Sequence, residues 1–219
     1  MIIMAAELLQ KLAARSITKK ELLQKVEQNF ILLPDVVNGV FSSKAEIRYG
    51  CAKVLMDLSE KHPEKIYPHM NFFINLLDSE YRILRWNAIA IIANLAKVDD
   101  DKKFDAIFDK YYDLLNDAYM VTVANVVRNS SKIALAKPYL TQKITNELLR
   151  VEKISTTPHL TEECKRVIAE HAIKSFVSFF DKIEQKEKVI SFVSSHLCSP
   201  RKTLRKAAEE FLVKFRQQL

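Results

Sequence analysis

Apolar residues recur along almost the whole chain at the three- and four-residue spacing of an α-helix. The alternation of apolar and polar positions typical of a half-buried β-strand is nowhere sustained. Thr18 with Glu21, and Ser43 with Glu46, have the spacing of a capping box, in which two side chains satisfy free N–H groups at a helix start. Ser199 can cap the last helix. The pattern therefore predicts an all-α protein.

Between these start signals the periodicity predicts about twelve helices, and consecutive helices form pairs. Their expected ranges are 4–15, 18–31, 34–42, 44–60, 64–77, 79–97, 101–115, 118–136, 139–154, 161–180, 184–197 and 200–217. No apolar run approaches the length that spans a bilayer, and the first residues read as an amphipathic helix and not as a secretion signal. Cytoplasm is therefore the expected location.

The second helices of the last five pairs align with one another. The aligned segments EIRYGCAKVLMDL, ILRWNAIAIIANL, VTVANVVRNSSKI, ECKRVIAEHAIKS and TLRKAAEEFLVKF begin 37 to 42 residues apart. A unit of two helices cannot bury its own apolar face, so such units must stack on their neighbours. The spacing therefore predicts an α-solenoid.

These units resemble the HEAT repeats of armadillo-type solenoids. The best match is LLDSEYRILRWNAIAIIANLA, with Asp78 in the turn and Arg85 at the arginine position of the family. Arg48 and Arg205 occupy that position in SSKAEIRYGCAKVLMDL and SPRKTLRKAAEEFL. The resemblance implies about five HEAT-like hairpins in residues 32–219, after N-terminal capping helices in residues 1–31, within one domain.

Two units depart from the family pattern. The fourth has Lys165 at the arginine position and a longer turn, and the third has Val123 there. HEAT-like arrays mostly serve as binding scaffolds, so the resemblance implies a protein without catalytic activity. One family of HEAT-like DNA glycosylases and the HEAT-like bilin lyases are the enzymatic alternatives. However, Asp57 and Asp78 lack the aromatic pocket that a glycosylase aspartate needs, and no lyase group can be placed.

Composition excludes several kinds of site. Two isolated glycines cannot form a phosphate-binding loop. The three cysteines are far apart and odd in number, which favours a reducing compartment over a disulfide framework. No CxxC or HExxH motif occurs, so we expect neither a metal nor another cofactor.

Four residues are expected to have a structural role between repeats. At 100° per residue, Arg85 lies at the margin of the apolar face of its helix. Its stem should pack there while its guanidinium reaches a turn acid or carbonyl of an adjacent unit. Arg48 and Arg205 should do the same, and Asp78 in the turn is also expected to be a structural residue between repeats.

Arg82 and Trp86 fall on the other side of that helix, which in such arrays lines the concave surface. Trp86 can equally pack on the neighbouring helix. Across the repeats, the Trp86 position carries Tyr49, Trp86, Ala124, Arg166 and Lys206, and the position two turns later carries Asp57, Asn94, Lys132, Lys174 and Lys214. The position between them carries Lys53, Ala90, Arg128, Glu170 and Glu210, so acids partly offset the trend toward basic residues.

The net charge of +7 follows the same trend, because residues 1–110 contribute +1 and residues 111–219 contribute +6. The expected function is an interaction scaffold that binds a protein partner on the concave face. The alternative is nucleic-acid binding along a basic groove in the C-terminal half. The candidate partner-binding residues are Tyr49, Arg82, Trp86, Arg128, Lys132, Arg166, Lys174, Lys206 and Lys214.

Overall fold

A computed structural model describes residues 2–216, with side chains from Glu7 onwards. Internal contacts divide the chain into two compact units, Met1–Lys103 and Phe104–Leu219. Within the described part the structure is helical, and the single β-bridge joins Thr157 to Leu160. The predicted all-α class is therefore confirmed.

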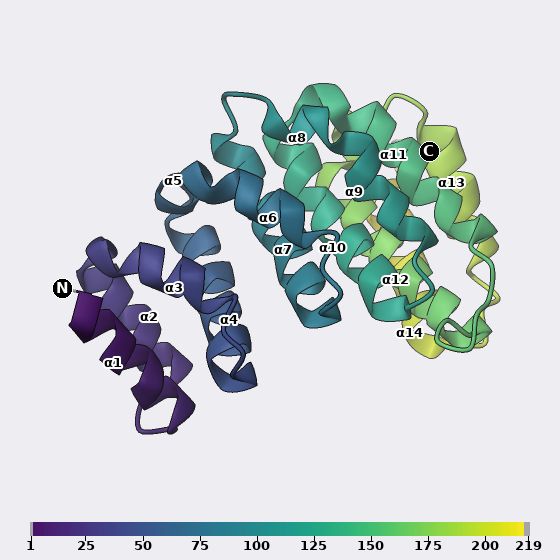
Figure 1. Cartoon of the computed structure of the whole chain (residues 1–219). Helices are drawn as coiled ribbons and strands as arrows, with labels where there is room; N and C mark the ends of the chain where they lie inside the picture. Colours follow the sequence, from purple (N-terminus) through teal and green to yellow (C-terminus); the bar gives the residue numbers. More distant parts are fainter. Residues whose placement is uncertain (1, 217–219) are drawn as a thin grey trace. The chain divides into compact units, whose positions relative to one another are not determined.

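The first unit consists of three successive helical pairs (Figure 1). Its helices are α1 (Ile2–Ala13), α2 (Lys19–Gln28), α3 (Leu33–Gly39), α4 (Ala45–Lys61), α5 (Pro63–Ile66), α6 (Met70–Leu76) and α7 (Arg82–Leu95). Short 3-10 turns at Phe30–Leu32, Tyr67–His69 and Ala96–Val98 join or extend them. Pairs follow one another in chain order, as the repeat pattern predicts.

The second unit continues the same alternation. Its helices are α8 (Lys103–Ala106), α9 (Phe108–Asp113), α10 (Met120–Ala136), α11 (Thr141–Leu149), α12 (Glu162–Phe179), α13 (Lys186–Ser195) and α14 (Lys202–Lys214). Turns of 3-10 helix lie at Leu114–Asn116, Pro138–Leu140, Arg150–Lys153 and Phe180–Lys182. Residue 217, where the last helix was expected to end, lies outside the described residues.

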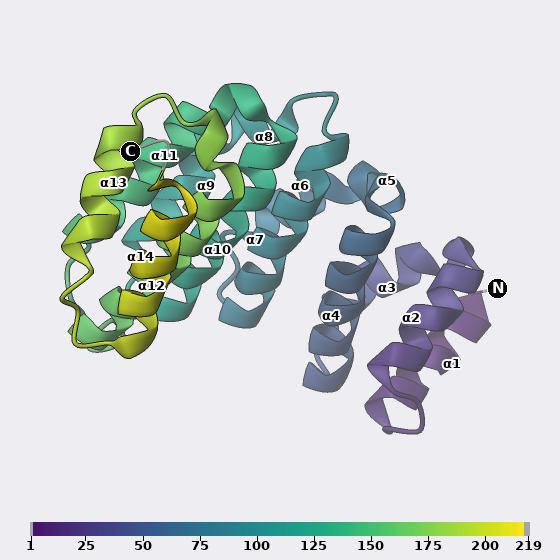
Figure 2. The same ribbon diagram turned by 180° about the vertical axis from the view of Figure 1, so that it is seen from behind.

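Each unit has two layers of helices. In the first unit, α2, α4 and α7 pack side by side, with α3 against α4 and α6 against α7. In the second unit, α10, α12 and α14 form the corresponding layer, which α11 and α13 cover (Figures 1 and 2). Residues 88–95 of α7 are all buried, because other helices surround this helix on several sides. Stacked hairpins therefore bury what a single pair could not.

Two of the predicted helices are broken. Residues 64–77 form α5, a 3-10 turn and α6, because Pro68 lacks an N–H and its ring clashes with a preceding carbonyl of a continuous helix. Residues 101–115 divide into α8 and α9 at Ile107, whose φ is −113° and ψ 10°. No proline explains this second break.

The two predicted capping boxes have different outcomes. The Thr18 N–H donates to Glu21 Oε2 (2.7 Å) and the Glu21 N–H donates to Thr18 Oγ1 (3.2 Å), so this box is confirmed. The box of Ser43 and Glu46 is wrong, because α4 begins one residue later and Lys44 takes the cap position without a side-chain hydrogen bond.

One glycine sets the distance between two helices. A Cβ atom on Gly39 of α3 would lie 2.5 Å from the Sγ atom of Cys51 in α4. Cys51 is fully buried. Real Cβ atoms do not approach sulfur this closely, so the side-chain-free position lets α3 and α4 pack in close contact.

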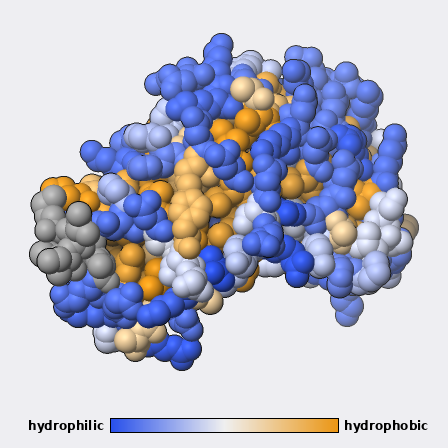
Figure 3. All heavy atoms as spheres, in the orientation of Figure 1, coloured by the Kyte–Doolittle hydropathy of each residue, from blue (hydrophilic) through white to orange (hydrophobic). Residues whose placement is uncertain are grey.

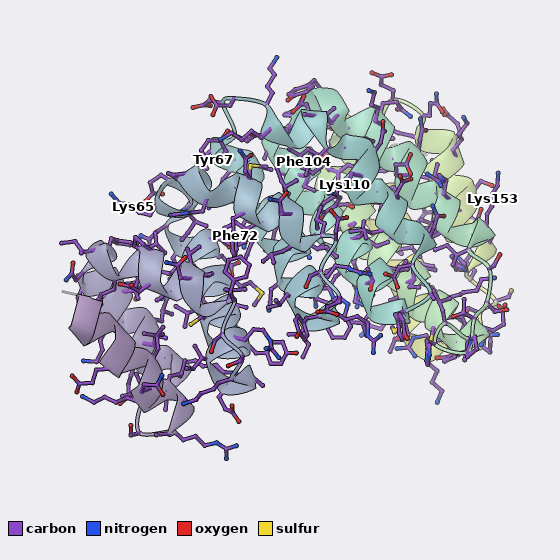
Figure 4. The ribbon with its side chains drawn as sticks, viewed as in Figure 1. Lys65, Tyr67, Phe72, Phe104, Lys110 and Lys153 are labelled. Atoms are coloured by element: carbon purple, nitrogen blue, oxygen red, sulfur yellow. The ribbon has the colours of Figure 1, made fainter. Side chains whose placement is uncertain are left out.

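The face shown in Figure 3 is mostly hydrophilic, with hydrophobic side chains reaching the surface near α3 and α6. Phe41, which is 71% exposed, contacts Phe72 edge to face, with a centroid distance of 5.4 Å. Phe72 is labelled in Figure 4. None of the helices in the described residues has the length and apolarity needed to cross a membrane.

Candidate partner-binding surface

The arginines at the family position cap the turns of their hairpins. Each guanidinium donates to the backbone carbonyl of a serine six residues earlier, in the turn that precedes its own helix. The bonds are Arg48 to Ser42 (2.9 Å), Arg85 to Ser79 (3.0 Å) and Arg205 to Ser199 (2.5 Å). The sequence interpretation placed these acceptors in an adjacent unit, whereas these three bonds lie within one repeat.

The same serines also shape the turn through their hydroxyl groups. Ser42 Oγ accepts from the N–H of Lys44 (3.2 Å), and Ser199 Oγ accepts from the N–H of Arg201 (3.3 Å). Ser199 is therefore not the cap of α14, whose cap position is Arg201. A serine six residues before each arginine was the sequence signal for this motif.

In the repeat that has Val123 instead of an arginine, the turn before α10 is contacted by the next repeat. Val123 cannot donate to the turn before α10, and the longer turn before α12 contacts that turn instead. Thr157 Oγ1 donates to the Ala118 carbonyl (2.6 Å), and the ring of His159 stacks on Tyr119 at 4.4 Å. The two departures from the family pattern therefore compensate for each other.

Arg48 also brings two aromatic side chains together. Its guanidinium carbon lies 4.9 Å from the ring centroid of Tyr49 and 4.1 Å from that of Tyr81. Tyr81 directly precedes α7, the second helix of the next repeat, and is 41% exposed, so this stack joins α4 to the start of α7 at the surface. Arg48 thus makes a contact between repeats as well as a hydrogen bond within its own.

Arg82 is exposed and Trp86 is half-buried on the first turns of α7, next to this stack in sequence. We call Tyr49, Tyr81, Arg82 and Trp86 the aromatic patch. Tyr49 also lines a cavity of 510 Å³ between the α1–α2 turn and α4, together with Leu12, Arg15, Lys19, Glu46 and Gly50 among others. The first unit thus offers aromatic side chains beside a hollow, an arrangement typical of binding hot spots. Asp78 lies exposed in the turn before Ser79.

The predicted basic residues all lie on second helices of the second unit. Three of them are paired with a glutamate on the same helix: Arg166 with Glu163 (3.1 Å), Lys174 with Glu170 (2.6 Å) and Lys206 with Glu210 (3.6 Å). Lys132 is exposed on α10, and the Lys214 ammonium lies 5.2 Å from the Phe215 ring centroid. Among the described residues of α12 and α14, the positive charge is therefore interrupted by carboxylates.

Glu170 is the most connected of these carboxylates, and its side chain is only 10% exposed. Arg201 Nε (3.1 Å) and Thr203 Oγ1 (2.6 Å) donate to it from the start of α14, in addition to Lys174. Burial alone would raise the pKa of Glu170, but the three hydrogen bonds outweigh burial and lower the pKa to about 2. This carboxylate therefore ties α12 to α14.

The described residues contain no group of three or more histidine, cysteine, aspartate or glutamate side chains that could hold a metal ion. Cys51 is fully buried, which raises the pKa of its thiol to about 12. That thiol is a packing group at the α3–α4 contact.

Solved structures with the same arrangement of helices are all-α repeat proteins. A designed armadillo repeat protein has a TM-score of 0.58 at 18% identity, over 94% of this chain and 89% of the other. A second designed armadillo repeat protein, in complex with the peptide (KR)4, has a TM-score of 0.60 at 17% identity, over 94% and 91%. The structure of the Pds5-Scc1 complex matches with a TM-score of 0.55 at 15% identity, over 97% of this chain and 30% of the other.

The chain has an armadillo/HEAT-like repeat fold. Neither a sequence-family description nor a curated protein matches this chain. The comparison confirms the resemblance drawn from Arg48, Arg85 and Arg205. At these identities it defines the fold alone.

Proposed function

We propose that this armadillo/HEAT-like repeat protein is a non-catalytic scaffold that binds a protein partner on the second helices of its repeats. The observation that carries the proposal is the aromatic patch, where Arg48 holds Tyr49 and Tyr81 at the surface of two neighbouring repeats. Tyrosine, tryptophan and arginine are the residue types that contribute most to protein interfaces. Two solved neighbours, one with a bound peptide and one described as a Pds5-Scc1 complex, support this choice.

The nucleic-acid alternative is less well supported by the electrostatics. Binding along a phosphate backbone needs several cations that are free to replace counterions. Arg166, Lys174 and Lys206 each lie beside a glutamate of their own helix. A phosphate chain would meet those carboxylates as well as the cations, so a protein segment with mixed chemistry fits this surface better.

The proposal is tested by comparing partner capture by the wild-type chain and by a Tyr81→Ala/Trp86→Ala variant. Proteins captured from the source organism should be lost with the variant, because its aromatic anchors are gone, and retained with Asn71→Ala on α6 of the other layer. Unchanged recovery with the aromatic variant would exclude this surface. Binding of mixed DNA and RNA that weakens steeply with salt would instead favour the nucleic-acid function.

A further inference from the structure

α10 differs in charge from the other second helices of its unit. Its 17 residues include Arg128 and Lys132 but no carboxylate. Val121 and Leu135 are 41% and 48% exposed, and Arg128 and Lys132 are exposed between them. At 100° per residue these four side chains fall within a sector of about 60° on the helix. We call them the α10 stripe.

Arg128 is the cation of this stripe that a ligand can reach without breaking an ion pair. Its guanidinium donates to Asn125 Oδ1 at 2.8 Å, and among the described residues it forms no ion pair. A solvated guanidinium that forms no ion pair readily donates charge-assisted hydrogen bonds to a carboxylate.

α12, which packs directly against α10, adds His171 and Lys174 to this surface. His171 is half-buried, and the charged groups around it are Arg128 on α10, Lys174 and Glu170 on α12, and Arg201 before α14. Burial lowers the pKa of His171, the cations lower it further, and Glu170 opposes them. The imidazole is therefore neutral at pH 7. The cations around it outnumber the acids, and the nearby carboxylate, Glu170, already accepts hydrogen bonds from Lys174, Arg201 and Thr203.

We propose that the α10 stripe, with His171 and Lys174, binds an acidic protein segment that carries an apolar side chain on either side of its carboxylates, and that His171 takes up a proton from solvent when the segment binds. This inference rests on the proposed scaffold function and names the chemistry of one bound segment.

The spacing of the stripe indicates the length of the segment. Val121 and Leu135 are separated by about 21 Å along the helix axis. An extended peptide covers that distance in about six residues. Carboxylates in the middle of such a peptide would reach Arg128 and Lys174, while apolar ends would cover Val121 and Leu135. A carboxylate placed near His171 would also favour the protonated imidazole, which links binding to pH.

The test uses a fluorescent synthetic peptide with two leucines about six residues apart and aspartate and glutamate between them. The wild-type chain should bind this peptide, and Arg128→Gln should weaken binding on the order of tenfold. Lys188→Gln on α13 removes the same charge from the other layer and should leave binding unchanged. Peptides with amides for carboxylates, or serines for leucines, should bind more weakly.

The pH dependence tests the histidine separately. Between pH 8 and pH 6 the peptide carboxylates stay ionised, so a rise in affinity on acidification reports His171. His171→Gln should remove that rise. No binding of the acidic peptide, equal binding of an oligonucleotide of the same charge, or unchanged affinity with Arg128→Gln would overturn the inference. A pH profile unaffected by His171→Gln would overturn the proton uptake.

The two proposals fail in different ways. If the acidic peptide does not bind but partner capture still depends on Tyr81 and Trp86, the scaffold function stands and the α10 assignment falls. If partner capture survives the aromatic variant while the peptide binds as described, the aromatic patch falls and the α10 stripe remains a binding surface.

Discussion

At the scale of single residues, the repeat is held by polar groups that touch turns and neighbouring helices. The structural role of the arginines could be predicted from the alignment, because each lies at the same position, beside the apolar face of its helix. Hydrophobic periodicity does not reveal their acceptors, and the serine six residues before each arginine is the only sequence feature that marks them. The stack of Arg48 between Tyr49 and Tyr81 depends on the packing of α4 against α7, which no local pattern specifies.

Arg85→Ala should lower the thermal unfolding midpoint while leaving partner affinity nearly unchanged. The loss removes the guanidinium bond to the Ser79 carbonyl, and hydrogen bonds to charged groups contribute about 1.5–3 kcal/mol. Arg82→Ala, three residues earlier on the same helix, is the matched control and should show the reverse pattern. Calorimetry with a partner-binding assay checks both, and a stable Arg85→Ala variant that no longer binds would place Arg85 in the binding surface.

Glu170→Gln should destabilise the chain by about 2 kcal/mol at pH 7, because the folded-state pKa of Glu170 is about 2 and lies below its unfolded value. That contribution is fully present above the unfolded pKa and is lost as pH falls through the folded one. The difference in unfolding free energy should therefore shrink between about pH 5 and pH 2. Urea unfolding across this range measures it, with exposed Glu187→Gln as the control. A difference that does not change with pH would contradict the account.

At the scale of elements, helices and their pairing could be read from the sequence because a 3.6-residue period and a repeat length both leave strong signals. Helix interruptions were harder to predict. Pro68 falls inside a continuous apolar pattern, so periodicity alone extended one helix across it. The spacing of Ser43 and Glu46 fits a capping box, but Ser42 forms the turn one residue earlier, and the helix starts late.

Gly39→Ala should destabilise the α3–α4 contact despite a better helix propensity. Alanine gains up to about 1 kcal/mol over glycine in a helix, whereas overpacking a buried site costs about 1–3 kcal/mol. Since the new Cβ would lie 2.5 Å from Cys51 Sγ, the steric cost should exceed the gain. Chemical unfolding of Gly39→Ala, Cys51→Ala and the double variant measures the coupling free energy between the two positions. If the losses in unfolding free energy are additive, the steric clash is not with the Cys51 sulfur.

At the scale of the whole molecule, the alignment located the basic residues on second helices, in a row that acids partly offset. The acids that interrupt it were visible at the Glu170 and Glu210 positions, yet their pairing depends on side-chain geometry. The aromatic patch was foreseen at Tyr49, Arg82 and Trp86, while the exposed apolar groups of α10 were missed. A single exposed valine or leucine has no sequence signature that separates it from the core.

The central claim is that partners bind the second helices of the repeats. The most direct test places a photo-cross-linking residue at Ile83, which is 42% exposed beside the aromatic patch, and separately at Asn71 on α6. Irradiation in the source organism should join a discrete partner to the chain from position 83 and not from position 71. The same partner captured equally from both positions, or only from position 71, would contradict the account.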